Sequence, residues 1–443
     1  MFTRKDLAKL LLPLIVERLL AVLVGMADVV MVAAVGETAV SGVSLVDSIS
    51  NLMINIFIGL SVGVNVIVAR YYGAKREKDV QDTIHTAMAL SIVSGLFLIV
   101  MGQLLSRPML ELMGTPDDVI DKSTIYMRII FIGMPANMIY NFGSAILRAV
   151  GDTKRPLYFL IVACLSNVVL DLVFVLVFKM GIAGVAIASI LAQAISAVMV
   201  VMSLSAESME YRFRFRQMRF EGDILSRTIR IGLPAGFQSI MYSLSNMLIQ
   251  ASVNRFGTDT VASWVVLGKV DGINWMILGA LGIASMTFVG QNYGAGRLDR
   301  IQKSLKLSLL IGVSISIVFG GALLLFGWPL FGLFTSDDTV LAMSMQLLWY
   351  FAPFYWLFVP IEIISGALRG MGDTLIPTII TATGICVFRV AWIYTVVPLH
   401  NSMFTVSLSY PISWVLTAIA FAIYYMIARK KLIANAPKPR TAE

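Results

Sequence analysis

The sequence predicts an all-α polytopic membrane protein, with twelve transmembrane helices in two pseudo-symmetric six-helix lobes around a central cleft. Three observations support this fold class. Of the 443 residues, 58% are hydrophobic and only 14% are charged, whereas soluble domains carry about 25% charged residues. Apolar runs of about twenty residues recur along the chain, each long enough to cross a hydrocarbon core of about 30 Å. Several motifs occur twice, once in each half of the chain.

The apolar runs predict helices because they lack the alternation of barrel strands, and only helices or closed barrels span lipid. The first run contains Glu17, Arg18 and Asp28 and has no small-residue cleavage site. We interpret it as a retained helix and not as a signal peptide. The predicted helices cover residues 10–34, 39–69, 80–104, 119–147, 157–178, 182–206, 228–254, 260–290, 304–327, 339–368, 375–398 and 403–428.

Four pairs of landmarks repeat at one constant offset in residue number, the offset that leads from Pro13 to Pro234. They are "KLLLPL" and "RIGLPA", "AAVGETAV" and "NRFGTDTV", "RYYGAKRE" and "QNYGAGRL", and "SAILRAVGDT" and "GALRGMGDT". Because six helices is an even number, both halves share one orientation, and a parallel repeat about the membrane normal follows. The expected domains are an N-lobe at 1–205, a cytoplasmic linker at 206–227 and a C-lobe at 228–443 with a short basic tail.

The last landmark pair marks the predicted cytoplasmic end of the fourth helix in each lobe. Arg148 and Arg369 lie in the final helical turn, where a cation interacts favourably with the helix dipole. Gly151 and Gly372 allow the left-handed turn that ends a helix. We therefore interpret this motif as a helix ending and a topology signal, not as a substrate site.

The net charge of +8 is unevenly distributed. Most of the Lys and Arg residues lie on alternate loops, and the intervening loops carry almost none. By the positive-inside rule, both termini and the basic loops are cytoplasmic. The charge therefore indicates membrane orientation, and we expect no nucleic-acid partner.

The sequence also lacks the usual signals of an enzyme. It has no GxxxxGK[ST], HExxH or CxxC motif, and its two histidines are far apart. Cys164 and Cys386 lie inside apolar segments, so we expect free thiols and no disulfide framework. We predict that the protein is not an enzyme and needs no cofactor.

Ionisable residues inside a membrane are costly and indicate functional sites. Glu17 and Asp28 are eleven residues apart, which places both on one side of the first helix. Asn167 and Asp171 lie four residues apart on one face of the fifth helix, and Ser189 adds a hydroxyl on the sixth. Such a group can hold a proton or a desolvated Na⁺. The alternative is a structural polar network that joins the helices.

The repeat separates these side chains from the scaffold. The offset of the landmarks leads from Glu17, Asp28, Asn167 and Asp171 to positions without an acid, listed in the same order as Gln238, Ile249, Phe388 and Trp392. The acidic cluster therefore exists only in the N-terminal half. This is expected if the chemistry of ion coupling belongs to one lobe.

Several stretches together resemble the bacterial multidrug and toxic compound extrusion (MATE) transporters. They are "PLIVERLLAVLVGMADVVMVAAVGETAVSGVSL", "GVNVIVARYYGAKR", "ILRAVGDTKRP", "SNVVLDLVFV", "GIAGVAIAS" and "SMTFVGQNYGAG…GALRGMGDT". The resemblance covers nearly the whole chain. It implies two helical bundles with a V-shaped cleft in the bacterial cytoplasmic (inner) membrane. It also implies export of organic, often cationic, compounds in exchange for Na⁺ or H⁺.

The pattern is most similar to the DNA-damage-inducible-type branch of that family. Its helix 1 aspartate, the main coupling residue, matches Asp28, and its helix 5 pair matches Asn167 and Asp171. A helix 6 hydroxyl matches Ser189, where the family more often has Thr, and a helix 4 tyrosine matches Tyr126. The other branch uses a glutamate on helix 7. The stretch "GLPAGFQSIMYSLSN" has no acid there, which leaves Glu362 as a candidate C-lobe acid.

We therefore expect a secondary antiporter for drug-like small molecules that functions as a monomer. Its ion-coupling residues are Asp28, Asn167, Asp171, Ser189, Tyr126 and Glu17, and Na⁺, if it is the ion, would bind at the first three. One alternative is a lipid-linked oligosaccharide flippase of the same superfamily, whose cavity would be lined by several basic residues. A membrane-embedded enzyme would need a catalytic constellation, and a passive channel would not need buried acids. The sequence leaves Na⁺ and H⁺ open.

Overall fold

The structure is a computed structural model that describes residues 10–20, 31–32, 37–115, 117–206 and 211–434. Helices account for nearly all of these residues, and none of them lies in a β-strand. Nine helices in these ranges are long and apolar enough to cross a membrane, or ten if one bent pair is counted as a single span. The predicted all-helical membrane fold is confirmed.

Most predicted helices appear within a few residues of their expected bounds. The helix expected at 228–254 forms as α8 (Gly222–Val253). It is not among the candidate spans, because polar side chains such as Gln238, Asn246 and Gln250 interrupt its apolar sequence. The helix expected at 10–34 lies partly outside the described residues, and residues 10–20 within it are helical.

The chain divides into two compact units, one from Leu12 to Gly236 and the other containing the described residues from Phe237 onward. The division falls inside α8, later in the chain than the predicted linker at 206–227. The described part of that linker belongs to the first unit. Its residues 214–219 contact His85, Thr86 and Asp82 of α3 (Glu77–Leu112).

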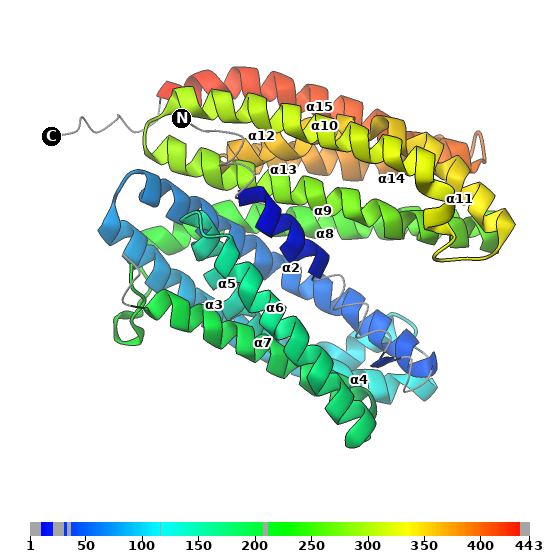
Figure 1. Ribbon diagram of the computed structural model, residues 1–443, viewed down its shortest axis with the longest axis horizontal. Coiled ribbons are helices and arrows are strands. Elements are labelled where there is room, and N and C mark those ends of the chain that lie inside the picture. Colours follow the sequence, from blue (N-terminus) through cyan, green and yellow to red (C-terminus); the bar gives the residue numbers. More distant parts are fainter. Residues whose placement is uncertain (1–9, 21–30, 33–36, 116, 207–210, 435–443) are drawn as a thin grey trace. The chain divides into compact units, whose positions relative to one another are not determined.

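The first unit contains the helices α2 to α7, the π-helix η1, the 3₁₀ turn η2 (Phe215–Gln217) and the first half of α8, and the longer helices are labelled in Figure 1. Phe131, Phe142 and Met138 are fully buried in its apolar core. Its fourth span bends by 46° at Gly133, where Pro135 removes a backbone donor near the start of the next helix. The elements are α2 (Glu37–Gly73), α3 (Glu77–Leu112), α4 (Asp117–Ile132), α5 (Met134–Ala149), α6 (Lys154–Asp171), the π-helix η1 (Leu172–Val177) and α7 (Gly181–Ser205).

The second unit repeats this plan with its own irregularities. Its fourth span is interrupted by a 3₁₀ turn containing Pro353, and its fifth span contains a π-helix. After the second half of α8, the elements are η3 (Asn254–Phe256), α9 (Thr258–Gly294), α10 (Leu298–Phe331), α11 (Asp338–Phe351), η4 (Ala352–Leu357), α12 (Val359–Gly370), α13 (Leu375–Thr381), η5 (Ala382–Val387), α14 (Phe388–Thr395) and α15 (Met403–Ala434).

The repeated motif ends both fourth spans in the same way. Gly151 and Gly372 have φ values of 97° and 88°, the left-handed conformation that glycine adopts without strain. The following amides of Asp152 and Asp373 donate to the carbonyl oxygens of Leu147 and Leu368 at 2.9 and 3.0 Å. This hydrogen bond closes a Schellman motif. The interpretation of the motif as a helix ending is confirmed.

Helices α9 and α12 approach closely through glycines. A Cβ atom added to Gly366 would lie 2.5 Å from the carbonyl oxygen of Gly282. Small residues permit such contacts between membrane helices. Gly366→Ala should therefore separate the two helices and lower the free energy of unfolding by about 1–3 kcal/mol. Thermal unfolding in detergent measures this loss.

Gly279→Ala is the matched control, because it lies on α9 and a Cβ there would meet no atom within 4 Å. Its expected unfolding temperature is unchanged or slightly higher, since alanine favours helices more than glycine does. Equal unfolding temperatures for the two variants would show that the crossing at Gly366 tolerates a side chain.

Candidate functional site

Two predicted site residues of the first unit lie on α6. Asn167 and Asp171 are one helical turn apart, with exposed fractions of 2% and 0%. Asp171 is the last residue of α6, and the π-helix η1 begins at the next position. The amide of Phe178 donates to the carbonyl oxygen of Val173 at 3.0 Å, five residues back. Such π-helical turns occur frequently at functional sites.

Two further predicted residues lie on neighbouring helices of this unit. Ser189 is on α7, which packs along α6 (Figure 1), and Tyr126 is buried on α4 with 3% exposure. The Ser189 hydroxyl and both polar atoms of the Asn167 amide are buried without a hydrogen-bond partner in the part of the chain that the structure describes. Unpaired buried oxygens of this kind can coordinate Na⁺, and the amide and hydroxyl can hydrogen-bond a neighbouring carboxyl group that takes up a proton. Asp28 lies outside the described residues.

Glu17 has a different environment. Its Oε1 lies 2.9 Å from Nη1 of Arg148, and the side chains are only 12% and 16% exposed. The Tyr140 hydroxyl lies 3.4 Å from the same oxygen and 3.3 Å from the carbonyl oxygen of Pro156. The arginine of the repeated motif therefore joins the end of α5 to the first helical segment of the chain.

The second unit contains the same contact without the acid. Arg369 Nη2 donates to Oε1 of Gln238 at 2.5 Å, and Thr378 lies 3.5 Å from that oxygen. Gln238 and Arg369 occupy the positions that the repeat makes equivalent to Glu17 and Arg148. The repeat thus preserves a contact between the arginine and a side-chain oxygen, while the partner is charged in one unit and neutral in the other.

A cavity of about 500 Å³ lies inside the second unit. Aromatic rings form much of its wall, and its polar side chains include two carboxylates and one guanidinium. The aromatic residues are Tyr242, Trp264, Trp275, Phe351, Phe358 and Tyr410, and the polar ones are Asn246, Gln250, Asp271, Glu362 and Arg389. Cavities that are mainly apolar with a few convergent polar groups are typical of small-molecule sites.

The charged groups of this cavity are held in position by neighbouring helices. The hydroxyl of Tyr355, a fully buried residue of η4, donates to Oδ1 of Asp271 on α9. The guanidinium of Arg389 lies 3.9 Å above the ring of Tyr410 and 5.9 Å from that of Trp414. Its Nε donates to Ser413 at 3.0 Å. Among the residues that the structure describes, no carboxylate is within ion-pair distance of Arg389.

Aromatic residues of the second unit occupy positions equivalent to the acidic cluster of the first. The offset of the repeat leads from Asn167, Asp171 and Ser189 to Phe388, Trp392 and Tyr410. The first two rings lie 5.7 Å apart, and the third lines the cavity and supports Arg389. Where one unit has carboxylate, amide and hydroxyl, the other has aromatic rings.

Glu362 was the predicted acid of the C-lobe, and it lines this cavity from α12. Sequence reasoning did not identify Asp271 or the aromatic wall as part of the site. One signal was present, because Trp275 and Trp414 follow Asp271 and Tyr410 by four residues. That spacing places each pair on one helix face.

Comparison with known proteins decides the family. The MatE family model matches residues 13–173 and 234–395, and the starts of the two segments are separated by the same offset as the repeated motifs. The chain belongs to the MatE family. It is a membrane-spanning transporter of the multidrug efflux type and not an enzyme.

Two relatives of this MatE protein are named for drug resistance. It is 29% identical to the probable multidrug resistance protein YoeA of Bacillus subtilis, over 89% of this chain and 87% of the relative. It is 26% identical to the probable multidrug resistance protein NorM of Thermotoga maritima, over 87% and 84%. A solved MATE in complex with MaL6 has the same fold, with a TM-score of 0.91, 19% identity and 97% coverage of each chain.

The comparisons and the cavity do not favour the flippase alternative. The two relatives are named for multidrug resistance. The described cavity contains a single basic side chain, Arg389, beside two acids and several aromatic rings. A flippase cavity was expected to contain several Lys and Arg residues.

Proposed function

We propose that this transporter is an antiporter of the bacterial cytoplasmic membrane that exports organic, often cationic, compounds in exchange for H⁺ or Na⁺. Both termini would face the cytoplasm, as the basic loops indicate. The protein would act as a monomer. A bound ion shifts the balance between two conformations only if it binds them with different affinities. Coupling therefore requires an ion site whose geometry differs between the two conformations.

The first unit supplies the proposed coupling site. Asn167 and Asp171 are buried on one face of α6, and the π-helix that begins after Asp171 allows local rearrangement of the backbone. Asp28, Ser189 and Tyr126 would complete the site. A buried carboxylate that gains and loses a proton, or gains and loses Na⁺, provides the required differential affinity. We propose that Glu17 instead holds Arg148 in place.

We propose that the cavity of the second unit is the substrate-binding site. The observation that carries this proposal is the Arg389 guanidinium, held 3.9 Å above Tyr410 in the cavity that contains Asp271 and Glu362. The aromatic wall thus already binds an organic cation that belongs to the protein. A cationic substrate can use the same ring faces by cation–π attraction and pair with the two carboxylates.

Efflux from proteoliposomes tests the antiport. The purified full-length protein is reconstituted and loaded with ethidium, and an inward Na⁺ gradient or an inward proton gradient is imposed separately. Efflux should accelerate under one of these gradients and not under an equal K⁺ gradient. If neither gradient accelerates efflux, the protein is not an ion-coupled antiporter.

The substrate-binding site in the second unit is tested by Asp271→Asn. Removal of this charge should raise the KM for ethidium efflux about tenfold, equivalent to about 1.4 kcal/mol, while the response to the ion gradient persists. Asp259→Asn is the matched control, because Asp259 is exposed in the first turn of the same helix. An unchanged KM for Asp271→Asn would exclude this cavity as the binding site of the cationic substrate.

A further inference from the structure

Residues 211–221, which lie between α7 and α8, are attached to α3 by side-chain and backbone contacts. Tyr211 and Phe213 are 7% and 1% exposed. The Phe213 ring packs against the imidazole of His85 with centroids 5.5 Å apart, and the backbone amide of Arg214 donates to Nε2 of His85 at 3.1 Å. The Tyr211 ring meets that of Tyr72 edge-on at 5.8 Å. These contacts fix the beginning of the segment.

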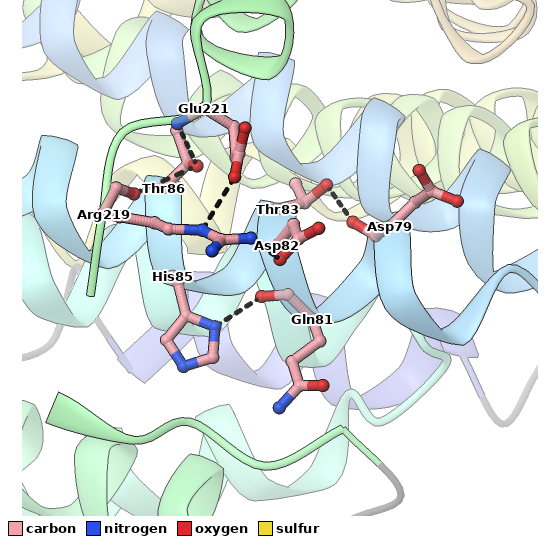
Figure 2. Close-up of polar contacts among 8 residues, drawn as sticks. All are labelled: Asp79, Gln81, Asp82, Thr83, His85, Thr86, Arg219 and Glu221. Carbon is pink, nitrogen blue, oxygen red and sulfur yellow. Dashed lines mark hydrogen bonds and ion pairs between the residues drawn. The ribbon is translucent and has the colours of Figure 1, made fainter. Parts of the chain in front are cut away.

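A second set of contacts fixes its end (Figure 2). The Thr86 hydroxyl donates to the carbonyl oxygen of Arg219 at 3.3 Å and accepts from the amide of Glu221 at 3.2 Å. The Arg219 guanidinium bridges Asp82 at 3.1 Å and Glu221 at 2.7 Å. Residues 214–220 therefore project from a segment that is held at both ends, which lowers the entropy lost when they bind a partner.

The outward side of this held segment combines apolar and cationic side chains. Phe215, Met218 and Phe220 are 61%, 37% and 48% exposed. Arg214 and Arg216 are exposed beside them. Neither arginine has a carboxylate within ion-pair distance in the described ranges. Arg219 differs, because its charge is already matched by two acids.

The position of this surface indicates what covers it. The segment lies between the end of α7, a candidate membrane span, and the start of α8. Large apolar side chains beside cations are typical of segments at the boundary between headgroups and acyl chains. An arginine guanidinium matches a phosphate group with two parallel hydrogen bonds. Both features together fit an anionic phospholipid.

We propose that residues 214–220 form a docking surface for anionic phospholipids. Arg214 and Arg216 bind the headgroup phosphate, and Phe215, Met218 and Phe220 enter the membrane interface. The orientation proposed from the basic loops places this surface at the cytoplasmic leaflet, where anionic lipids attract basic segments. Lipid docking does not depend on antiport, so either proposal can fail alone.

Native mass spectrometry of the full-length protein tests the docking surface. The delipidated protein is titrated with phosphatidylglycerol and, separately, with phosphatidylcholine of the same acyl chains. The wild type should bind phosphatidylglycerol at least five times more tightly. The double variant Arg214→Gln/Arg216→Gln should lose this preference, and Phe215→Ser/Phe220→Ser should weaken the binding of both lipids.

Arg107→Gln is the matched control, because Arg107 is an exposed arginine of the same unit that is already paired with Glu111 and Asp121. Its lipid preference should equal that of the wild type. Equal retention of the two lipids by the wild type, or an unchanged preference in the double arginine variant, would overturn the proposal. Displacement of phosphatidylglycerol by equimolar inorganic phosphate would overturn the lipid assignment, since the surface would then recognise phosphate alone.

Discussion

Gradient-driven efflux should fall at least about tenfold in Asp171→Asn, equivalent to about 1.4 kcal/mol or more of activation free energy. Asparagine has nearly the same shape as aspartate, so the buried end of α6 should keep its packing. Asparagine neither releases a proton nor carries the charge that attracts Na⁺. The measurement is efflux from proteoliposomes under an imposed ion gradient.

Two controls separate coupling from folding. Asp121→Asn removes a carboxylate of the same unit whose side chain is 74% exposed, and its efflux should match that of the wild type. Asp28→Asn should behave like Asp171→Asn if the two acids share one site. Normal efflux by both Asp28→Asn and Asp171→Asn under either gradient would refute the coupling site in the first unit.

Loss of the ion pair between Arg148 and Glu17 should lower the free energy of unfolding substantially. In Arg148→Met, the Glu17 carboxylate stays largely buried, and its Oε2 already lacks a hydrogen-bond partner among the described residues. Breaking a buried pair from one side costs about 3–5 kcal/mol. We expect the free energy of unfolding to fall by an amount near the lower end of this range, because both side chains are slightly exposed. Thermal unfolding in detergent should show a clear decrease in the unfolding temperature.

Glu17→Gln is the informative comparison, because it reproduces the contact that Gln238 and Arg369 make in the second unit. The loss of unfolding free energy should stay below about 1 kcal/mol, since the amide oxygen still accepts from Arg148. Efflux should also persist. Loss of ion-driven efflux in a well-folded Glu17→Gln protein would instead assign Glu17 to the coupling site.

Hydropathy and the repeat were enough to predict the helical membrane fold. The reason is physical, because every backbone polar group inside lipid must be satisfied within helices or barrels. The same pattern pointed to Asn167 and Asp171, which are buried on α6, and their role in ion coupling stays a prediction. It also predicted the turns at Gly151 and Gly372, since a helix ending of this type depends on local φ values.

The sequence by itself therefore determined most of the helices, the repeat and the acids that only one half carries, because these depend on local composition and spacing. Tertiary structure decided which distant side chains meet. It joined Glu17 to Arg148 across 131 positions and placed Arg389 on Tyr410. It also placed the described part of the linker against α3, at His85 and Thr86. Such contacts depend on how helices pack in three dimensions, and no local period of one sequence encodes that packing.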